Sequence, residues 1–166
     1  MTDASRPLEL HLLRHADAGD PEAWTGDDAA RPLSGKGRRQ AGRLGRHLAA
    51  IDLRLDAIIS SPKLRARETA EIVAEALGAT VRLDDRLAGG FGPTEAEAIR
   101  HDAGSPRRIL LVGHDPDFSE LLADLVGAPS LGLKKGALAR VDVADAVTSG
   151  GGILRWLLPP DVLRET

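Results

Sequence analysis

The chain has 166 residues, of which 22 are Lys or Arg and 25 are Asp or Glu, so its formal net charge is −3. This balance excludes a global basic excess that would attract nucleic acid or an anionic membrane. Hydrophobic residues make up 42% of the chain, enough for one full-sized core, and we expect residues 1–166 to form a single domain. The absence of cysteine excludes a thiolate nucleophile, a cysteine-ligated metal centre and any disulfide.

The start of the chain and its hydrophobic runs predict a cellular location. The first ten residues, MTDASRPLEL, carry an acid early and lack the apolar core of a signal peptide. No apolar run approaches the ~20 residues that a membrane-spanning helix needs. We therefore expect a cytoplasmic protein that binds neither membrane nor nucleic acid, and our working expectation is a monomer.

The N-terminal part of the chain predicts a strand, a long loop and a helix. Leu8–Leu13 is a short apolar run typical of a strand, and residues 16–33 are rich in Gly, Pro and Asp, as in a loop. Ser34 is a candidate N-cap for a helix that reaches Ile51. Its apolar residues recur every three or four positions and form one stripe: Ala41, Leu44, Leu48 and Ile51.

The middle of the chain predicts a second strand and helix. Leu55–Ile59 is an apolar run, and Ser60-Ser61-Pro62 then supplies a cap and a proline at the first helical position. We expect this helix to run through Leu77 and to end at Gly78. A third strand is predicted over Ala79–Leu83.

The C-terminal part repeats the pattern and ends in two strands. After a loop at 89–93, Thr94 and Glu97 have capping-box spacing for a short helix. Residues 107–112 predict a buried strand, and Asp115 with Pro116 then predicts a capped helix to Val126. The alternating segments 137–143 and 153–158 are typical of two antiparallel strands. Strands that alternate with helices predict an α/β sandwich.

Polar residues follow three of the predicted strands at their carboxyl ends. These are Arg14 with His15, the two serines that lead to Arg65, and His114. Ligands bind at the carboxyl ends of strands in open α/β sheets. If the fold brings these ends together, two guanidiniums and two imidazoles form a pocket that suits a phosphoryl group.

Other interpretations of these residues are weaker. His11 and His15 have the spacing of a helical metal pair, but on a strand that spacing places them far apart on one face, and we expect no metal site. The segment from Gly35 to Gly37 resembles a phosphate loop, yet it lacks the spacing of that motif and a preceding strand. A solvated basic helix explains this segment better.

Four motifs resemble the histidine phosphatase superfamily, in that family's order. Arg14-His15 resembles its RHG-type signature, and Leu33-Ser34 through Gln40-Ala41 is similar to its L-[ST]-x-x-G-x-x-Q-A segment. Ser60-Ser61-Pro62 through Ala70 resembles its S-S-P-x-x-R-A-x-x-T-A segment, and Val112-Gly113-His114 matches its second-histidine motif. The resemblance implies a phosphoglycerate mutase-like fold, which is a three-layer α/β sandwich with a mixed, mostly parallel sheet.

Within this superfamily the chain resembles the SixA-type phosphohistidine phosphatases. The resemblance rests on its small size, on Ala16 and on residues 27–34, the lead-in to the second motif. The resemblance implies that His15 is the nucleophile and that Arg14, Arg65 and His114 bind the phosphoryl oxygens. It implies no metal and no cofactor. The implied substrate is a phosphohistidine-bearing protein, with phosphate as the product.

The predicted substrate is supported by one departure from the family. Many members that act on alcohol phosphates have a Glu as proton donor after the third strand, where this chain has Gly89. An imidazole departs more readily than an alkoxide, since the histidine pKa is ~6.5. Several acids remain possible substitutes for the missing donor: Asp17, Asp84, Asp85 and Glu95.

Two other functions remain open at this point. The first is a small-molecule phosphomonoesterase of the same superfamily, which would use a displaced acid. The second is a module that binds phosphorylated residues without catalysis, because a pocket alone does not prove turnover.

Overall fold

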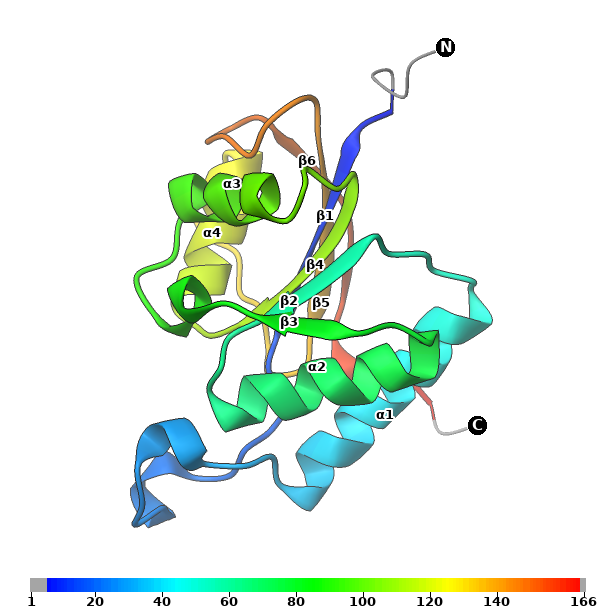
Figure 1. The fold of residues 1–166 in the computed structure, drawn as a ribbon. Coiled ribbons are helices and arrows are strands. Elements are labelled where there is room, and N and C mark those ends of the chain that lie inside the picture. Colours follow the sequence, from blue (N-terminus) through cyan, green and yellow to red (C-terminus); the bar gives the residue numbers. More distant parts are fainter. Residues whose placement is uncertain (1–5, 165–166) are drawn as a thin grey trace.

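The computed structural model describes residues 6–164, which fold around a six-stranded sheet (Figure 1). The strands are β1 (Leu8–Arg14), β2 (Ala57–Ser60), β3 (Val81–Leu83), β4 (Arg108–Gly113), β5 (Leu138–Val143) and β6 (Gly152–Leu158). The α-helices of the described residues are α1 (Gly35–Ala50), α2 (Leu64–Leu77), α3 (Pro93–Asp102) and α4 (Asp117–Val126). Among these helices, none has the length and apolar content needed to cross a membrane.

The sheet is mixed and mostly parallel, as predicted. Its strand order is β3-β2-β4-β1-β5-β6. Strands β3, β2, β4 and β1 pair in parallel, whereas β5 is antiparallel to β1 and β6 is antiparallel to β5. Parallel neighbours need a crossover connection, which the intervening helices provide.

Helices cover both faces of the sheet, with α1 and α2 on one face and α3 and α4 on the other (Figure 1). Successive side chains of a strand point to opposite faces, so β1 contributes residues to the core on each side of the sheet. Leu10 and Leu12 belong to the core under α3 and α4, whereas Leu13 packs in the core under α1 and α2. The predicted three-layer α/β sandwich is confirmed.

Helix α1 forms as predicted except at its last residue. The Ser34 hydroxyl accepts a hydrogen bond from the Gly37 N–H at 3.0 Å, and Leu44 and Leu48 are buried. The prediction for Ile51 is wrong, since this side chain is 54% exposed. The helix ends at Ala50, so Ile51 leaves the apolar stripe.

The predicted start of α2 is also wrong. The helix begins at Leu64 with Lys63 as its N-cap, so Pro62 lies before the helix and not at its first position. The Ser61 hydroxyl accepts a hydrogen bond from the Lys63 N–H at 3.2 Å and forms a turn between β2 and α2. Gly78 ends the helix as predicted, with a φ of 66° that suits glycine.

Helix α3 begins at Pro93, one residue before the capping box that was predicted at Thr94 and Glu97. Its N-cap is Gly92, and the carboxylate of Glu95 accepts a hydrogen bond from the Gly92 N–H at 2.9 Å. Glu97 has a different partner, because it accepts a hydrogen bond from the Val147 N–H at 2.9 Å. The predicted pairing of Thr94 with Glu97 is therefore wrong.

Helix α4 begins at Asp117, so Pro116 takes the cap position and not the first helical position. The capping role predicted for Asp115 is nevertheless performed by its side chain. Its carboxylate accepts hydrogen bonds from the N–H of Ser119 at 3.0 Å and from the Ser119 hydroxyl at 2.6 Å.

Candidate active site

The carboxyl ends of β1, β4 and β2 meet at one edge of the sheet, because these strands are parallel neighbours. The residues that follow them are His15, His114 and Ser61. The ring centroids of the two histidines lie 5.3 Å apart. Arg14 is the last residue of β1, and Arg65 lies in the first turn of α2. The structure thus places the four predicted site residues together.

His15 is buried and held in one tautomer. Its Nδ1 lies 2.7 Å from the Ala16 carbonyl oxygen. Because a carbonyl oxygen can only accept, Nδ1 carries the proton of the neutral ring and Nε2 keeps its lone pair. Burial, with the charges of Arg65 and Arg14, lowers the pKa of His15 to about 4. At neutral pH this ring is uncharged and able to act as a nucleophile.

His114 is also uncharged at neutral pH. Burial, with the nearby His15 and the charge of Arg65, lowers its pKa to about 3. Its Nε2 lies 2.7 Å from the Ser61 hydroxyl oxygen, which already accepts a hydrogen bond from the Lys63 N–H. The hydroxyl proton can then be donated to Nε2, which leaves the ring proton of His114 on Nδ1.

The guanidinium of Arg65 is fixed by the long loop between β1 and α1. Arg65 is 6% exposed, and it donates hydrogen bonds to the Asp28 carbonyl oxygen at 2.8 Å and to the Asp28 carboxylate at 3.0 Å. Although burial opposes it, the pairing with Arg65 and Arg31 lowers the pKa of Asp28. The loop therefore presents a carboxylate, not a carboxylic acid, to Arg65.

The guanidinium of Arg14 is fixed by residues that precede β5 and follow β4. It donates a hydrogen bond to the Leu133 carbonyl oxygen at 3.0 Å and lies 3.3 Å from the carboxylate of Asp115. Asp115 thus contacts both α4 and Arg14, so the turn after β4 also orients the last residue of β1. Sequence analysis assigned only the capping role to this carboxylate.

Three buried nitrogen atoms of the site have no hydrogen-bond partner. They are Nε of Arg14, Nε of Arg65 and Nδ1 of His114. An unsatisfied buried polar atom costs ~1–3 kcal/mol, a cost that a bound acceptor would remove. Each can donate to an oxygen atom, and together they suit an anion that offers several acceptor oxygens, such as a phosphoryl group.

Helix α1 holds the segment that follows His15. A Cβ at Gly37 would overlap the Asp17 carbonyl oxygen, so the chains approach this closely only with glycine. The Ser34 N–H donates to that carbonyl at 3.0 Å, and the side-chain oxygen of Gln40 accepts from the Asp17 N–H at 2.9 Å. This is the physical role of the Ser34 to Gln40 motif.

Two of the acids considered as proton donors are ionised and paired. The hydrogen bond from the Ser34 hydroxyl lowers the pKa of Asp17, whose carboxylate also lies 3.7 Å from Nζ of Lys135. The hydrogen bond from the Arg86 side chain lowers the pKa of Asp84. Carboxyls with lowered pKa values hold no proton to donate at neutral pH.

The other two acids have no contact that would make them donors. Glu95 accepts the hydrogen bond from the Gly92 N–H at the start of α3, and Asp85 is exposed in the short 3-10 helix Asp85–Ala88. Gly89, where a glutamate would be expected, ends that helix. Among residues 6–164, no three His, Asp or Glu side chains gather in a group that could hold a metal ion.

Besides the contact of Asp115 with Arg14, sequence reasoning missed three contributors to the site. Asp28, Ser61 as the partner of His114, and Lys135 beside Asp17 act through contacts between segments distant in the chain. Asp28 follows no periodic pattern, and its only signal was its place in the lead-in at 27–34. The pairing of Asp28 with Arg65 spans 37 residues and becomes visible only once the loop is folded.

The model of the histidine phosphatase superfamily (branch 1) matches residues 10–102. An uncharacterised protein of Picosynechococcus sp. is 35% identical over an alignment of 170 positions, gaps included, which covers 92% of this chain and 100% of that protein. The family match spans more than half of the chain, and the relative is similar over nearly all of it.

Two solved structures share the fold. The protein histidine phosphatase SixA complexed with tungstate has a TM-score of 0.81 at 23% identity, over 94% of this chain and 99% of that chain. A protein from Nakamurella multipartitia, provisionally described as phosphohistidine phosphatase SixA, has a TM-score of 0.71 at 29% identity, over 92% and 95% of the two chains. The chain belongs to the histidine phosphatase superfamily, and this membership supports a phosphatase activity.

Proposed function

We propose that this phosphatase removes the phosphoryl group from a histidine of another protein, through a phosphohistidine intermediate on His15 and without a metal ion. The observation that carries the proposal is the state of the acids. The carboxylates of Asp17, Asp28 and Asp84 have lowered pKa values and are paired with cations or hydroxyls. A site without a proton donor favours a leaving group that departs as neutral imidazole.

In the first step, the lone pair on Nε2 of His15 attacks phosphorus. The bond from phosphorus to the substrate imidazole breaks, and its electron pair stays on that ring. A substrate ring protonated on its other nitrogen leaves as neutral imidazole, which its pKa of ~6.5 allows near neutral pH. The proton on Nδ1 of His15 stays in its hydrogen bond with the Ala16 carbonyl, which stabilises the charged phosphohistidine.

In the second step, water attacks phosphorus and the bond to Nε2 of His15 breaks. Its electron pair returns to Nε2, and the two hydrogens of water leave with dihydrogen phosphate. Arg14, Arg65 and His114 hold the three equatorial oxygens throughout, through the nitrogen atoms that lack other partners. Donors fixed in advance stabilise the charge of the transition state without reorganisation.

The test is phosphate release from a phosphohistidine protein and from alkyl and sugar phosphates, with EDTA present. We expect faster turnover of phosphohistidine by the wild-type protein and none by His15→Ala. A preference for an alkyl phosphate would favour a phosphomonoesterase with a donor outside the four acids considered. Tight phosphate binding without turnover of either class would favour a binding module.

A further inference from the structure

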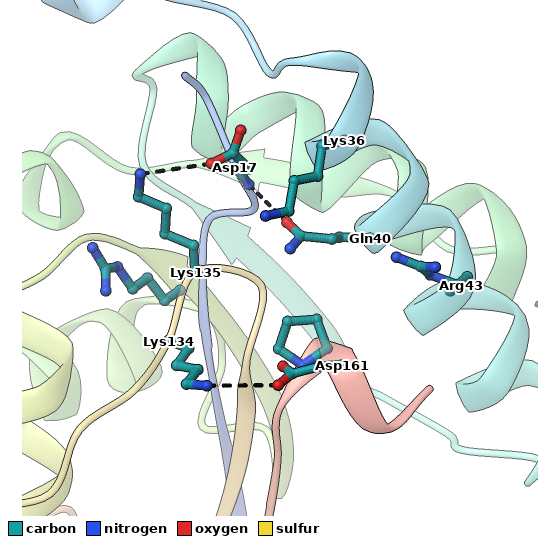
Figure 2. Close-up of a pocket in the computed structure, with 9 residues that line it drawn as sticks. Asp17, Lys36, Gln40, Arg43, Lys134, Lys135 and Asp161 are labelled. Carbon is teal, nitrogen blue, oxygen red and sulfur yellow. Dashed lines mark hydrogen bonds and ion pairs between the residues drawn. The ribbon is translucent and has the colours of Figure 1, made fainter. Parts of the chain in front are cut away.

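A basic groove lies along helix α1, and Arg14 of the candidate active site lines one end of it. Its first part is a cavity of about 520 Å³, lined by cations from three segments of the chain (Figure 2). These cations are Arg14, Lys36, Arg43, Lys134 and Lys135. A second cavity of about 270 Å³ shares Arg43 with the first and adds Arg46 and Arg164. We call these two cavities together the basic groove.

The spacing of residues along α1 makes the groove continuous. Lys36, Gln40, Arg43 and His47 all line it, at positions i, i+4, i+7 and i+11, which share one face of a helix. With a rise of about 1.5 Å per residue, this stripe is about 17 Å long. Helix α1 contains no Asp or Glu, so no charge on its own surface neutralises the stripe.

The acids of the groove neutralise only part of its charge. Asp161 lies 3.5 Å from Nζ of Lys134, and Asp17 lies 3.7 Å from Nζ of Lys135 (Figure 2). Lys134 and Asp161 are 72% and 68% exposed, and exposed pairs contribute only ~0–1 kcal/mol, so an incoming carboxylate can replace Asp161. The groove is thus positively charged on a chain whose formal net charge is −3.

Arg14 belongs both to the groove and to the phosphoryl site, so the two are adjacent. It lines the first cavity of the groove and also presents a nitrogen without a partner to the site. The charge of Lys135 lowers the pKa of His15 together with those of the two arginines, so it acts on the nucleophile from the groove side. A ligand whose phosphoryl group reaches His15 would therefore extend its next residues toward these cations.

We propose that the basic groove binds an acidic segment of the protein whose phosphohistidine enters the site. A polypeptide suits the groove because about five extended residues, at ~3.3 Å each, span 17 Å. A sugar phosphate is too short to reach Arg46 and Arg164. This inference rests on the proposed function, and it narrows the substrate to phosphohistidine proteins with Asp and Glu residues near the phosphorylated histidine.

Two pairs of charge reversals test the proposal. Lys36→Glu with Lys134→Glu changes the first cavity, and Arg46→Glu with Arg164→Glu changes the second. All four side chains are exposed, so the core stays intact. The matched control is Arg54→Glu with Arg82→Glu, which makes the same charge change at exposed positions that do not line the groove.

The substrates are two synthetic phosphohistidine peptides of equal length, one with Asp and Glu around the phosphohistidine and one with Asn and Gln. We expect the wild-type kcat/KM to be about tenfold higher for the acidic peptide, through a lower KM. Reversal in the first cavity should remove this preference, and reversal in the second should reduce it about threefold. Raising salt from 50 to 500 mM should remove it in the wild type, since salt screens exposed charges.

Other results would overturn the inference. Equal kcat/KM for the two peptides in the wild type would do so, as would a preference that survives reversal in the first cavity or falls equally in the control. Tighter binding of a single-stranded RNA than of the unphosphorylated acidic peptide, measured by fluorescence anisotropy, would assign the groove to nucleic acid. If neither peptide is dephosphorylated, the proposed function fails, and anisotropy with the unphosphorylated peptides still tests the groove separately.

Discussion

Two buried histidines, one in the middle of strand β1 and one directly after it, have similarly lowered pKa values and different surroundings. The pKa of both His11 and His15 is lowered to about 4, mainly by burial and further by the charges of nearby arginines. His11 lies mid-strand, its ring 5.6 Å from that of Trp156. His15 follows the end of the strand and faces His114.

The difference lies in how the neighbouring charges are satisfied. Beside His11, Arg140 donates to the Asp142 carboxylate at 2.9 Å, and Arg155 donates to the same carboxylate at 2.8 Å. Beside His15, Arg14 and Arg65 each keep a buried Nε without a partner. A lowered histidine pKa alone therefore does not identify a catalytic residue. Cations that keep free donors beside the ring distinguish the candidate nucleophile from a core histidine.

The largest effect should come from the nucleophile. His15→Ala should lower phosphohistidine turnover at least about a thousandfold, because it removes the atom that accepts the phosphoryl group. Phosphate-release kinetics measure the loss, and circular dichroism checks that the fold is retained. An active His15→Ala protein would refute the assigned nucleophile.

The next effect should come from the guanidinium in α2. Arg65→Ala should lower turnover about a hundredfold and weaken inhibition by inorganic phosphate, because a preorganised donor is lost. Arg65→Lys keeps the charge but lacks the planar guanidinium that can donate two parallel hydrogen bonds, so it should recover only a small part of the activity lost in Arg65→Ala. Full activity of Arg65→Lys would mean that charge alone is needed.

A smaller effect should come from the loop that holds this guanidinium. Asp28→Asn keeps the shape and one acceptor oxygen, but it removes the charge that pairs with Arg65, and we expect turnover to fall about tenfold. Asp20→Asn, in the same loop, is the matched control. Its side chain caps the nearby 3-10 helix and has no contact with Arg65 among the described contacts. Equal losses in both variants would indicate a general loosening of the loop.

His11 should affect stability and not turnover. His11→Ala leaves a cavity in the core, which we expect to cost about 2–4 kcal/mol of unfolding free energy while turnover stays within about twofold. Urea unfolding and phosphate release measure the two quantities on one preparation. A loss of turnover comparable to that of His15→Ala would remove the distinction between the two histidines.

The smallest effect concerns acid stability. A buried histidine whose pKa is about 4 binds a proton less readily than the unfolded chain, whose histidine pKa is ~6.5. Between these values the unfolded state holds more protons, so these histidines lower the unfolding free energy as pH falls from ~6.5 to ~4 and contribute no pH dependence above ~6.5. His11→Ala should make this fall shallower, by at most about 1.4 kcal/mol per pH unit. An equal slope would show that His11 does not titrate on unfolding.

The strand ends of the site could be predicted from sequence, and the loop contacts could not. Short apolar runs mark β1, β2 and β4, and parallel pairing then places the residues after them at one edge, as for His15 and His114. The contact of Asp28 with Arg65 depends on the path of residues 16–33, which has no periodicity. The start of α2 was misplaced for a related reason, because the Ser61 hydroxyl forms a turn where a cap was expected.

The most direct test of the account is capture of the intermediate. The wild-type protein is mixed with a phosphohistidine protein, quenched in base within milliseconds and digested, and the phosphorylated peptide is located by mass spectrometry. We predict an acid-labile, base-stable phosphoryl group on His15. A phosphoryl group on His114 alone, or turnover with no phosphorylated enzyme at any time point, would contradict the account.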